Sequence, residues 1–220
     1  MIRTSSHSPS RAAGFTLIEL LTVMAIIAVL AGLTVGLTSA ARSAKTNSRM
    51  KADLQQLQTA IENYKADRNA YPPDHKLPAG SSVKVNPAVN QLFYELRGLD
   101  VANGEFRVRG SSQGLTPEQV ERVFGRKGFL NASVDTSEPA RSYFDPKASQ
   151  VKRTTIDGVP VDLLVTAFDW PASAPEAAPL AGNRSNPWRY VSTSPTNNAS
   201  GFDLWAEVYV GSEKRIFKNW

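Results

Sequence analysis

The longest hydrophobic feature of the chain is a run from Phe15 to Leu37. As an α-helix rising about 1.5 Å per residue, it matches a bilayer hydrocarbon core of about 30 Å. The run contains one acid, Glu19, five residues from its start. An acidic residue near a bilayer centre costs roughly 2.5 to 3.5 kcal/mol, so its presence indicates a function. The pattern predicts a membrane-length helix with a functional carboxylate near its beginning.

The helix is predicted to continue well beyond the apolar run, because no proline occurs between Phe15 and Tyr71. Pro72 disfavours helical geometry at the residue before it, so the helix should end near Asn69. One apolar stripe at spacings of four and three predicts packing against the rest of the chain. The stripe is Met50, Leu54, Leu57, Ile61 and Tyr64, and the face expected in solvent is Lys51, Asp53, Gln55, Gln56 and Glu62.

After the helix, short segments with helical spacing of apolar residues occur among segments in which apolar and polar residues alternate as in strands. This mixture predicts an α+β domain. Capping signals at Asn86-Pro87 and Thr116-Pro117-Glu118-Gln119 open two short helices. The first should bury Val89, Leu92, Phe93 and Leu96 before Gly98, and the second Val120, Val123 and Phe124. The predicted strands are 105–109, 161–168, 202–210 and 214–220, with a hairpin turn at Gly211-Ser212 between the last two. The third strand alternates strictly, which predicts one inward face made of Phe202, Leu204, Ala206, Val208 and Val210.

Composition narrows the class of protein. The 220 residues carry a formal charge of +5 and no cysteine. Disulfides, thiolate nucleophiles and cysteine-based metal sites are therefore excluded. Lysine and arginine are scattered among acids, and no basic run interleaves with aromatic residues. We interpret the charge as a mildly basic surface and predict no nucleic-acid partner.

No catalytic constellation is visible. His7 precedes the apolar run, which leaves His75 alone in a proline-flanked loop, where a solvated histidine is expected. The acids show no metal-ligand spacing, and no glycine-rich phosphate loop, nucleophile elbow or zinc motif occurs. The chain is predicted not to be an enzyme.

The amino-terminal segment allows three interpretations. A secretory signal peptide would be cleaved before Ala41, although its apolar core is longer than usual and contains an acid. A plain membrane anchor would place Glu19 near the interface. The third rests on Gly14-Phe15-Thr16-Leu17-Ile18-Glu19-Leu20, which follows a leader containing Arg3 and Arg11 and no acid.

The segment from Gly14 to Leu20 resembles the processing site of type IV pilins and type II secretion pseudopilins. The resemblance implies that a prepilin peptidase cuts after Gly14 and methylates the new amino terminus, Phe15. Residues 1–14 would be the cleaved leader. Residues 15–37 would be the transmembrane half of the first helix and residues 38–70 its amphipathic half.

The distal part of the chain resembles the major pseudopilins. Tyr71-Pro72 matches the exit of their first helix. Pro187-Trp188, Phe202-Asp203-Leu204 and Asn219-Trp220 resemble their Pro-Trp, Tyr-Asp-Leu and terminal Asn-Trp motifs. The implied pilin-like fold packs the long helix on a small antiparallel sheet. Residues 71–220 would form a periplasmic α+β head with an enlarged insertion at residues 74–185.

The resemblance implies a structural subunit of a type II secretion pseudopilus, polymerised at the bacterial inner membrane to drive protein export. It would be single-pass, with its carboxyl-terminal domain in the periplasm. Its partners would be like subunits, the prepilin peptidase, the inner-membrane platform of the secretion system and minor pseudopilins. The alternatives are a pilin of a type IV surface pilus, which often has a terminal cysteine pair, and a monomeric membrane-anchored binding domain.

Glu19 is predicted to act in assembly. Cleavage after Gly14 leaves a free amine about one helical turn away, and the helix dipole favours a first-turn carboxylate. Glu19 of one subunit would then pair with the Phe15 amine of a neighbour. One pattern opposes the expected topology, because Arg42, Lys45, Arg49 and Lys51 follow the apolar run and a positive-inside count would place them in the cytoplasm.

Calcium is the one metal that the resemblance raises, since major pseudopilins often bind it in a loop after the Tyr-Asp-Leu strand. Calcium takes six to eight oxygen ligands. The corresponding loop here, residues 209–213, is a tight turn with the single acid Glu213. Asp203 lies on the strand and is expected to be a surface or capping residue. No cofactor or metal is therefore predicted.

Overall fold

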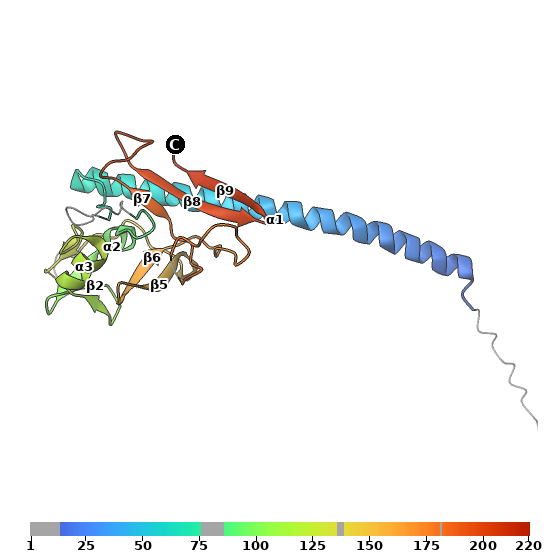
Figure 1. Ribbon diagram of the computed structural model, residues 1–220, viewed down its shortest axis with the longest axis horizontal. Coiled ribbons are helices and arrows are strands. Elements are labelled where there is room, and N and C mark those ends of the chain that lie inside the picture. The colour runs from blue at the N-terminus through green and yellow to red at the C-terminus, as the bar shows by residue number, and fades with distance from the viewer. Residues whose placement is uncertain (1–13, 76–85, 136–138, 181) are drawn as a thin grey trace, which may run out of the picture. The chain divides into compact units, whose positions relative to one another are not determined.

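The computed structural model describes residues 14–75, 86–135, 139–180 and 182–220, with only the backbone given for residues 33–39. The described chain is mixed α+β (Figure 1). It divides into two compact units, residues 1–45 and residues 46–220. We refer to these as unit 1 and unit 2. The sequence also predicts a proline-, glycine- and serine-rich loop from the helix exit to about Val85, and residues 76–85 of that loop lie outside the described residues.

In chain order the helices are α1 (Leu17–Arg68), α2 (Leu92–Arg97), α3 (Pro117–Phe124) and the 3₁₀ turn η1 (Ala148–Gln150). The strands are β1 (Leu99–Ala102), β2 (Glu105–Val108), β3 (Gly114–Leu115), β4 (Ala132–Ser133), β5 (Val151–Ile156), β6 (Val159–Leu164), β7 (Arg189–Val191), β8 (Asp203–Val210) and β9 (Glu213–Lys218). They form three sheets, ordered β3-β2-β1-β4, β5-β6 and β7-β8-β9. All pairs are antiparallel except β1 with β4.

Helix α1 ends where the sequence predicts. Asn69 adopts a left-handed conformation with φ of 55°, and its amide donates to the Lys65 carbonyl over 2.8 Å. The apolar stripe is buried along its whole length, with Met50, Ile61 and Tyr64 completely inaccessible. This stripe is the face of α1 on which unit 2 is built.

One residue of the predicted solvent face is in fact buried. Asp53 is only 8% exposed and accepts a hydrogen bond from Gln150 Nε2 over 3.1 Å. Burial raises the pKa of the Asp53 carboxyl, partly countered by the charge of Arg49. The periodicity of α1 did not reveal this, because the covering residue lies almost a hundred positions away in η1.

The carboxyl-terminal sheet confirms the predicted alternation except at Val210, which is only partly buried at the end of β8. Phe202, Leu204, Ala206 and Val208 all face inward with at most 3% exposure. Strand β9 returns antiparallel after the tight turn, pairing Val210 with Glu213. The sheet shares one hydrophobic core with the α1 stripe, and β8 and β9 run beside the second half of α1 (Figure 1).

Two of the predicted central elements needed correction. The helix expected from Pro87 begins only at Leu92. The reason is Asn90, whose side chain donates to the carbonyls of Pro87 and Trp188 and accepts from the Leu92 amide. Side-chain bonds of this kind compete with helical ones. The strand expected over 161–168 spans Val159–Leu164 instead, in a hairpin with β5 that the sequence reading missed.

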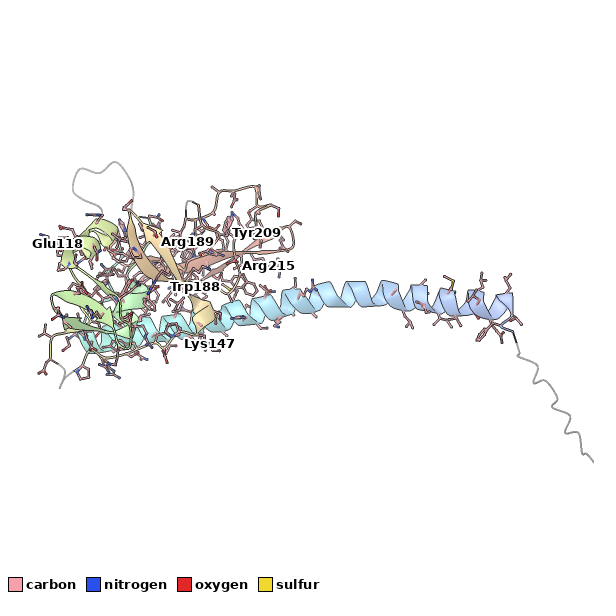
Figure 2. The ribbon with its side chains drawn as sticks, turned by 90° about the horizontal axis from the view of Figure 1, so that it is seen from below. Glu118, Lys147, Trp188, Arg189, Tyr209 and Arg215 are labelled. Atoms are coloured by element: carbon pink, nitrogen blue, oxygen red, sulfur yellow. The ribbon has the colours of Figure 1, made fainter. Side chains whose placement is uncertain are left out.

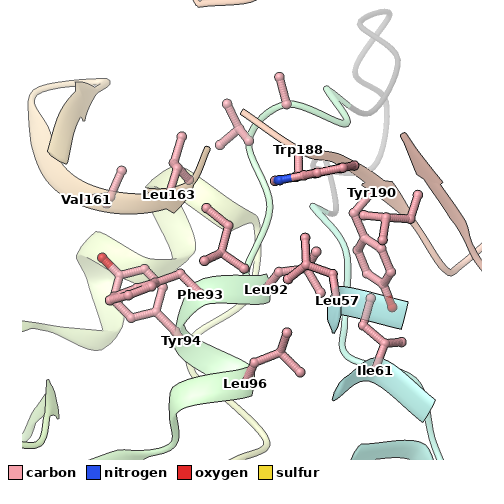
Figure 3. Packing of buried hydrophobic residues seen from close by; sticks show 14 of the residues in the cluster. Leu57, Ile61, Leu92, Phe93, Tyr94, Leu96, Val161, Leu163, Trp188 and Tyr190 are labelled. Atoms are coloured by element: carbon pink, nitrogen blue, oxygen red, sulfur yellow. The ribbon is translucent and has the colours of Figure 1, made fainter. Parts of the chain in front are cut away.

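Helix α3 and the core agree with expectation. Thr116 and Gln119 form the predicted reciprocal capping box. Buried Val120, Val123 and Phe124 join the same core cluster as α1 and α2. Figure 3 shows Leu57 and Ile61 of α1 beside Leu92 and Tyr190. The core of unit 2 is thus continuous from α1 through α2 to the sheets.

A buried polar hub joins the insertion to α1. The Glu95 side chain is inaccessible to solvent and accepts from Tyr64 Oη over 2.8 Å, from the Leu130 amide over 2.8 Å and from the Asn131 amide over 2.9 Å. Asn131 is also fully buried, and its Nδ2 donates to the carbonyls of Glu95 and Arg141. Its Oδ1 accepts from Arg68 Nη2 over 2.5 Å.

The hydrogen bonds around Glu95 predict how much the Tyr64 hydroxyl contributes to stability. Tyr64→Phe leaves one oxygen of the buried Glu95 carboxylate without its hydroxyl donor. Because hydrogen bonds to charged groups contribute about 1.5 to 3 kcal/mol, the free energy of unfolding should fall by that amount. Urea unfolding of the full chain in detergent, followed by tryptophan fluorescence, measures it.

The matched control is Tyr143→Phe. Tyr143 contacts the Tyr64 ring at a centroid distance of 5.2 Å, and the structure describes no hydrogen bond for its hydroxyl. Its loss should change the free energy of unfolding by less than about 0.5 kcal/mol. Equal effects of both variants would show that the Glu95 contact is not what stabilises this corner.

Candidate processing and assembly site

Gly14, Phe15 and Thr16 lie outside any helix or strand, and all three are exposed. The peptide bond between Gly14 and Phe15 therefore precedes α1 by two residues and is open to solvent. A protease binds its substrate in an extended form, and glycine permits close approach of the backbone. The local geometry suits cleavage at this bond. Arg11, Ala12 and Ala13 of the motif lie outside the described residues.

Thr16 and Glu19 start α1 with a capping box. The Glu19 Oε2 atom accepts from the Thr16 amide over 2.9 Å and from Thr16 Oγ1 over 2.8 Å. In return, the Glu19 amide donates to Thr16 Oγ1 over 3.3 Å. These bonds satisfy amides that the first turn of a helix leaves without partners. Glu19 is therefore held against its own chain, in the first turn of the helix.

The sequence reading missed this interaction, although the signal was present. A Thr-x-x-Glu spacing directly before an apolar run is the capping-box pattern. The spacing of Thr16 and Glu19 is the same signal as that of Thr116 and Gln119, and it is sufficient to predict this capping box. The Oε1 atom of Glu19 has no hydrogen bond described, so the carboxylate has one free oxygen.

The apolar side chains that follow are exposed on every side of the helix. Phe15 is 81% exposed and Leu17 83%, and each large apolar residue described as far as Leu30 is at least 46% exposed. Apolar surface of this extent marks an interaction site. Among the residues that the structure describes, it contains no helix with the length and apolar character needed to span a bilayer. The predicted transmembrane segment 15–37 includes residues 33–37, whose side chains lie outside the description.

This amino terminus is matched by one known family signature. The prokaryotic N-terminal methylation motif matches residues 9–35. The motif is the signature of type IV pilin-like and pseudopilin proteins, and it indicates a precursor that a prepilin peptidase processes and that assembles into a filament. No curated protein and no solved structure matches the chain.

The residues weighed for metal and catalysis are engaged in structural contacts. Asp203 is 4% exposed, so the expected surface position is wrong and the capping role is right. Its carboxylate accepts from the amides of Thr196, Asn197 and Asn198 over 2.8 to 3.0 Å. Burial opposes its ionisation, but these amides outweigh burial and hold the pKa of Asp203 below its usual range.

His75 is also buried, at 9% exposure, which corrects the expectation of a solvated side chain. Desolvation lowers its pKa, while the charges of Asp74 and Asp157 act in the opposite direction. Asp74 itself accepts from the amides of Ser192 and Thr193. Within the described residues, no group of three or more histidine, aspartate or glutamate side chains is arranged to hold a metal ion.

The capping box predicts a difference between two conservative substitutions. Thr16→Val keeps the shape of the side chain but removes the cap, which costs about 0.5 to 2 kcal/mol. Amide hydrogen exchange in the first turn of α1 should accelerate by about two- to thirtyfold, as this free energy implies. NMR of the full chain in detergent micelles measures the exchange.

Glu19→Gln is the counterpart, because glutamine also serves as the third residue of a capping box. Exchange in the first turn should stay close to that of the unmodified chain. A Thr16→Val chain with unchanged exchange would mean that the apolar run alone determines where α1 begins.

Proposed function

We propose that this chain is a major-pseudopilin-like subunit of a type II secretion pseudopilus. The peptidase cuts after Gly14 and methylates Phe15. Residues 15–37 anchor the subunit in the bacterial inner membrane, and residues 38–220 lie in the periplasm. Polymerisation, aided by the membrane platform and minor pseudopilins, drives protein export. The chain acts mechanically and carries out no catalysis.

The observation that carries this proposal is the exposed apolar surface of α1, which begins immediately after the cleavage motif. Exposed side chains between Phe15 and Leu30 cannot be covered by unit 1 itself, since each is open to solvent in the single chain. Lipid covers such a helix before assembly, and neighbouring helices cover it in a filament. Lipid and neighbouring helices are the two surroundings that a processed subunit meets as it moves from the membrane into the filament.

Glu19 supplies the polar contact between subunits in this proposal. Its Oε2 atom is used by Thr16, while Oε1 is free in the described structure. The new amine of Phe15 on a neighbouring subunit would donate to Oε1. An ammonium–carboxylate contact is a charge-assisted hydrogen bond, about twice as strong as a neutral one. The capping box would hold the carboxylate in place for that contact.

The carboxyl-terminal motif supports the secretion subclass over a surface pilus. Asn219 accepts from the Leu204 amide and donates to the Phe202 carbonyl, each over 2.9 Å. Trp220 meets Trp205 edge-to-face at 5.8 Å. The chain end is thereby closed onto β8 without cysteine. Surface pilins often use a terminal disulfide for this, and the sequence has no cysteine.

The first test is the mature amino terminus. Mass spectrometry of the chain purified from cells should find it starting at Phe15 and carrying one methyl group. Gly14→Val should leave the precursor uncut, because a branched side chain blocks close approach to the scissile bond. A chain that retains Met1, or that starts at Ala41, would contradict the proposal.

The second test separates processing from assembly. Glu19→Gln should still be cut and capped, but filament incorporation beside the unmodified chain should fall about tenfold, the factor for 1.4 kcal/mol of lost interaction. Lysine crosslinking and fibre fractionation measure incorporation. Accumulation of exported proteins in the periplasm of cells lacking the chain would support secretion, whereas loss of surface fibres alone would favour the pilus.

A further inference from the structure

A polar cleft lies in unit 2, away from the processing segment. Its volume is about 350 Å³, and it opens between the β2–β3 hairpin and the β5–β6 hairpin. A volume of this size falls at the low end of the range for small-molecule sites, about 300 to 1,000 Å³. Neither the methylation motif nor the proposed filament explains why the chain should form it.

Two arginine–carboxylate forks line the cleft. Arg107 donates from Nε and Nη2 to Glu105 Oε2 over 3.2 and 2.7 Å. Arg153 donates from Nε and Nη2 to the two oxygens of Asp162 over 2.9 and 2.7 Å. Each positive group is therefore neutralised by its own partner. The cleft offers planar polar groups in fixed orientations without an excess charge that would attract an ion.

Three polar groups at this cleft keep unused hydrogen-bonding capacity. Tyr94, only 5% exposed, accepts from the Asp162 amide over 2.8 Å, and no acceptor for its own proton is described. Burial raises the pKa of Tyr94 well above its usual range, so the hydroxyl keeps that proton. Arg107 Nη1 and Glu105 Oε1 likewise have no hydrogen-bond partner in the described part of the chain.

The orientation of Tyr94 follows from its ring contacts. The ring packs against Phe93, Phe124 and Phe129 at centroid distances of 4.9 to 5.9 Å. This aromatic packing leaves the hydroxyl directed toward the strand that carries Val161 (Figure 3). The tyrosine is thus held rigidly, with its free donor at the cleft.

We propose that this cleft binds a neutral saccharide of one or two rings. A sugar hydroxyl donates one hydrogen bond and accepts two, so it satisfies a free donor and a free acceptor together. Neighbouring hydroxyls match the planar arginine and carboxylate groups. The cleft also has apolar walls, formed by Phe106, Val108, Leu115 and Pro160. These can pack against the C–H face of a sugar ring, while the polar groups bind its hydroxyls. An extended peptide is the competing ligand, and the test below includes it. The site is independent of the proposed function.

Ligand-observed saturation-transfer NMR on the full chain tests the proposal. The probes are glucose, N-acetylglucosamine and their β-1,4-linked disaccharides, in a detergent whose head group contains no sugar. At least one probe should bind saturably. Tyr94→Phe and Arg107→Gln should each weaken that binding at least fivefold. The Arg107 side chain is 34% exposed, so its replacement tests the site even where Tyr94→Phe disturbs folding.

Arg109→Gln is the matched control, because Arg109 lies two residues from Arg107, is paired with Asp100 and lines a different cavity. The Arg109→Gln chain should bind the same sugar probe with an affinity within twofold of that of the unmodified chain. The proposal is overturned if no probe binds saturably, if Arg107→Gln binds as tightly as Arg109→Gln, or if an extended neutral peptide binds at this cleft and the sugars do not.

Discussion

Unit 2 depends on keeping the carboxyl group of Glu95 fully hydrogen-bonded away from water. An isolated buried charge costs several kcal/mol, so each donor around Glu95 must be held in place. The donors come from α1 and from the segment at Leu130 and Asn131. Burial still raises the pKa of Glu95, despite these donors. One carboxyl group thereby ties the insertion to the last turns of the long helix.

The same solution recurs at other corners of unit 2. Asp74 and Asp203 are buried and each gathers amides from the segment between Ser192 and Asn198. A different contact, the ion pairs of Lys214 with exposed Glu176 and with Glu207, connects the loop after Trp170 to the terminal sheet, where Arg189 and Tyr209 also lie (Figure 2). In a chain without disulfides, buried acids that bind backbone amides hold the long connections in position.

The two parts of helix α1 differ in whether the rest of the chain covers their apolar side chains. In unit 2 its stripe is covered by α2 and the sheets of the same chain. In unit 1 its apolar side chains are left open. Apolar surface without a cover within the chain requires a partner outside it. The capping box at Thr16 and Glu19 begins that open surface, within the residues that the methylation motif matches.

The sequence by itself determined what local chemistry controls. The stripe from Met50 to Tyr64, the end of α1 before Pro72, the capping box at Thr116 and the inward face of β8 were all predicted and confirmed. So was the prepilin-type motif, which depends on consecutive residues. The capping box at Thr16 also depends only on local spacing, because Thr16 and Glu19 are three residues apart directly before an apolar run.

Only the tertiary structure decided the contacts between residues far apart in sequence. Asp53 fits the solvent face of α1 by periodicity, yet Gln150 covers it. Asn90 delays α2 because it binds the distant Trp188 carbonyl. By its position in the sequence, Glu95 is an ordinary polar residue of a short helix. Only the fold brings Tyr64 and Asn131 close enough to donate hydrogen bonds to its buried carboxyl group. Burial and hydrogen bonding depend on which segments meet in space, and periodicity along one element carries no information about that.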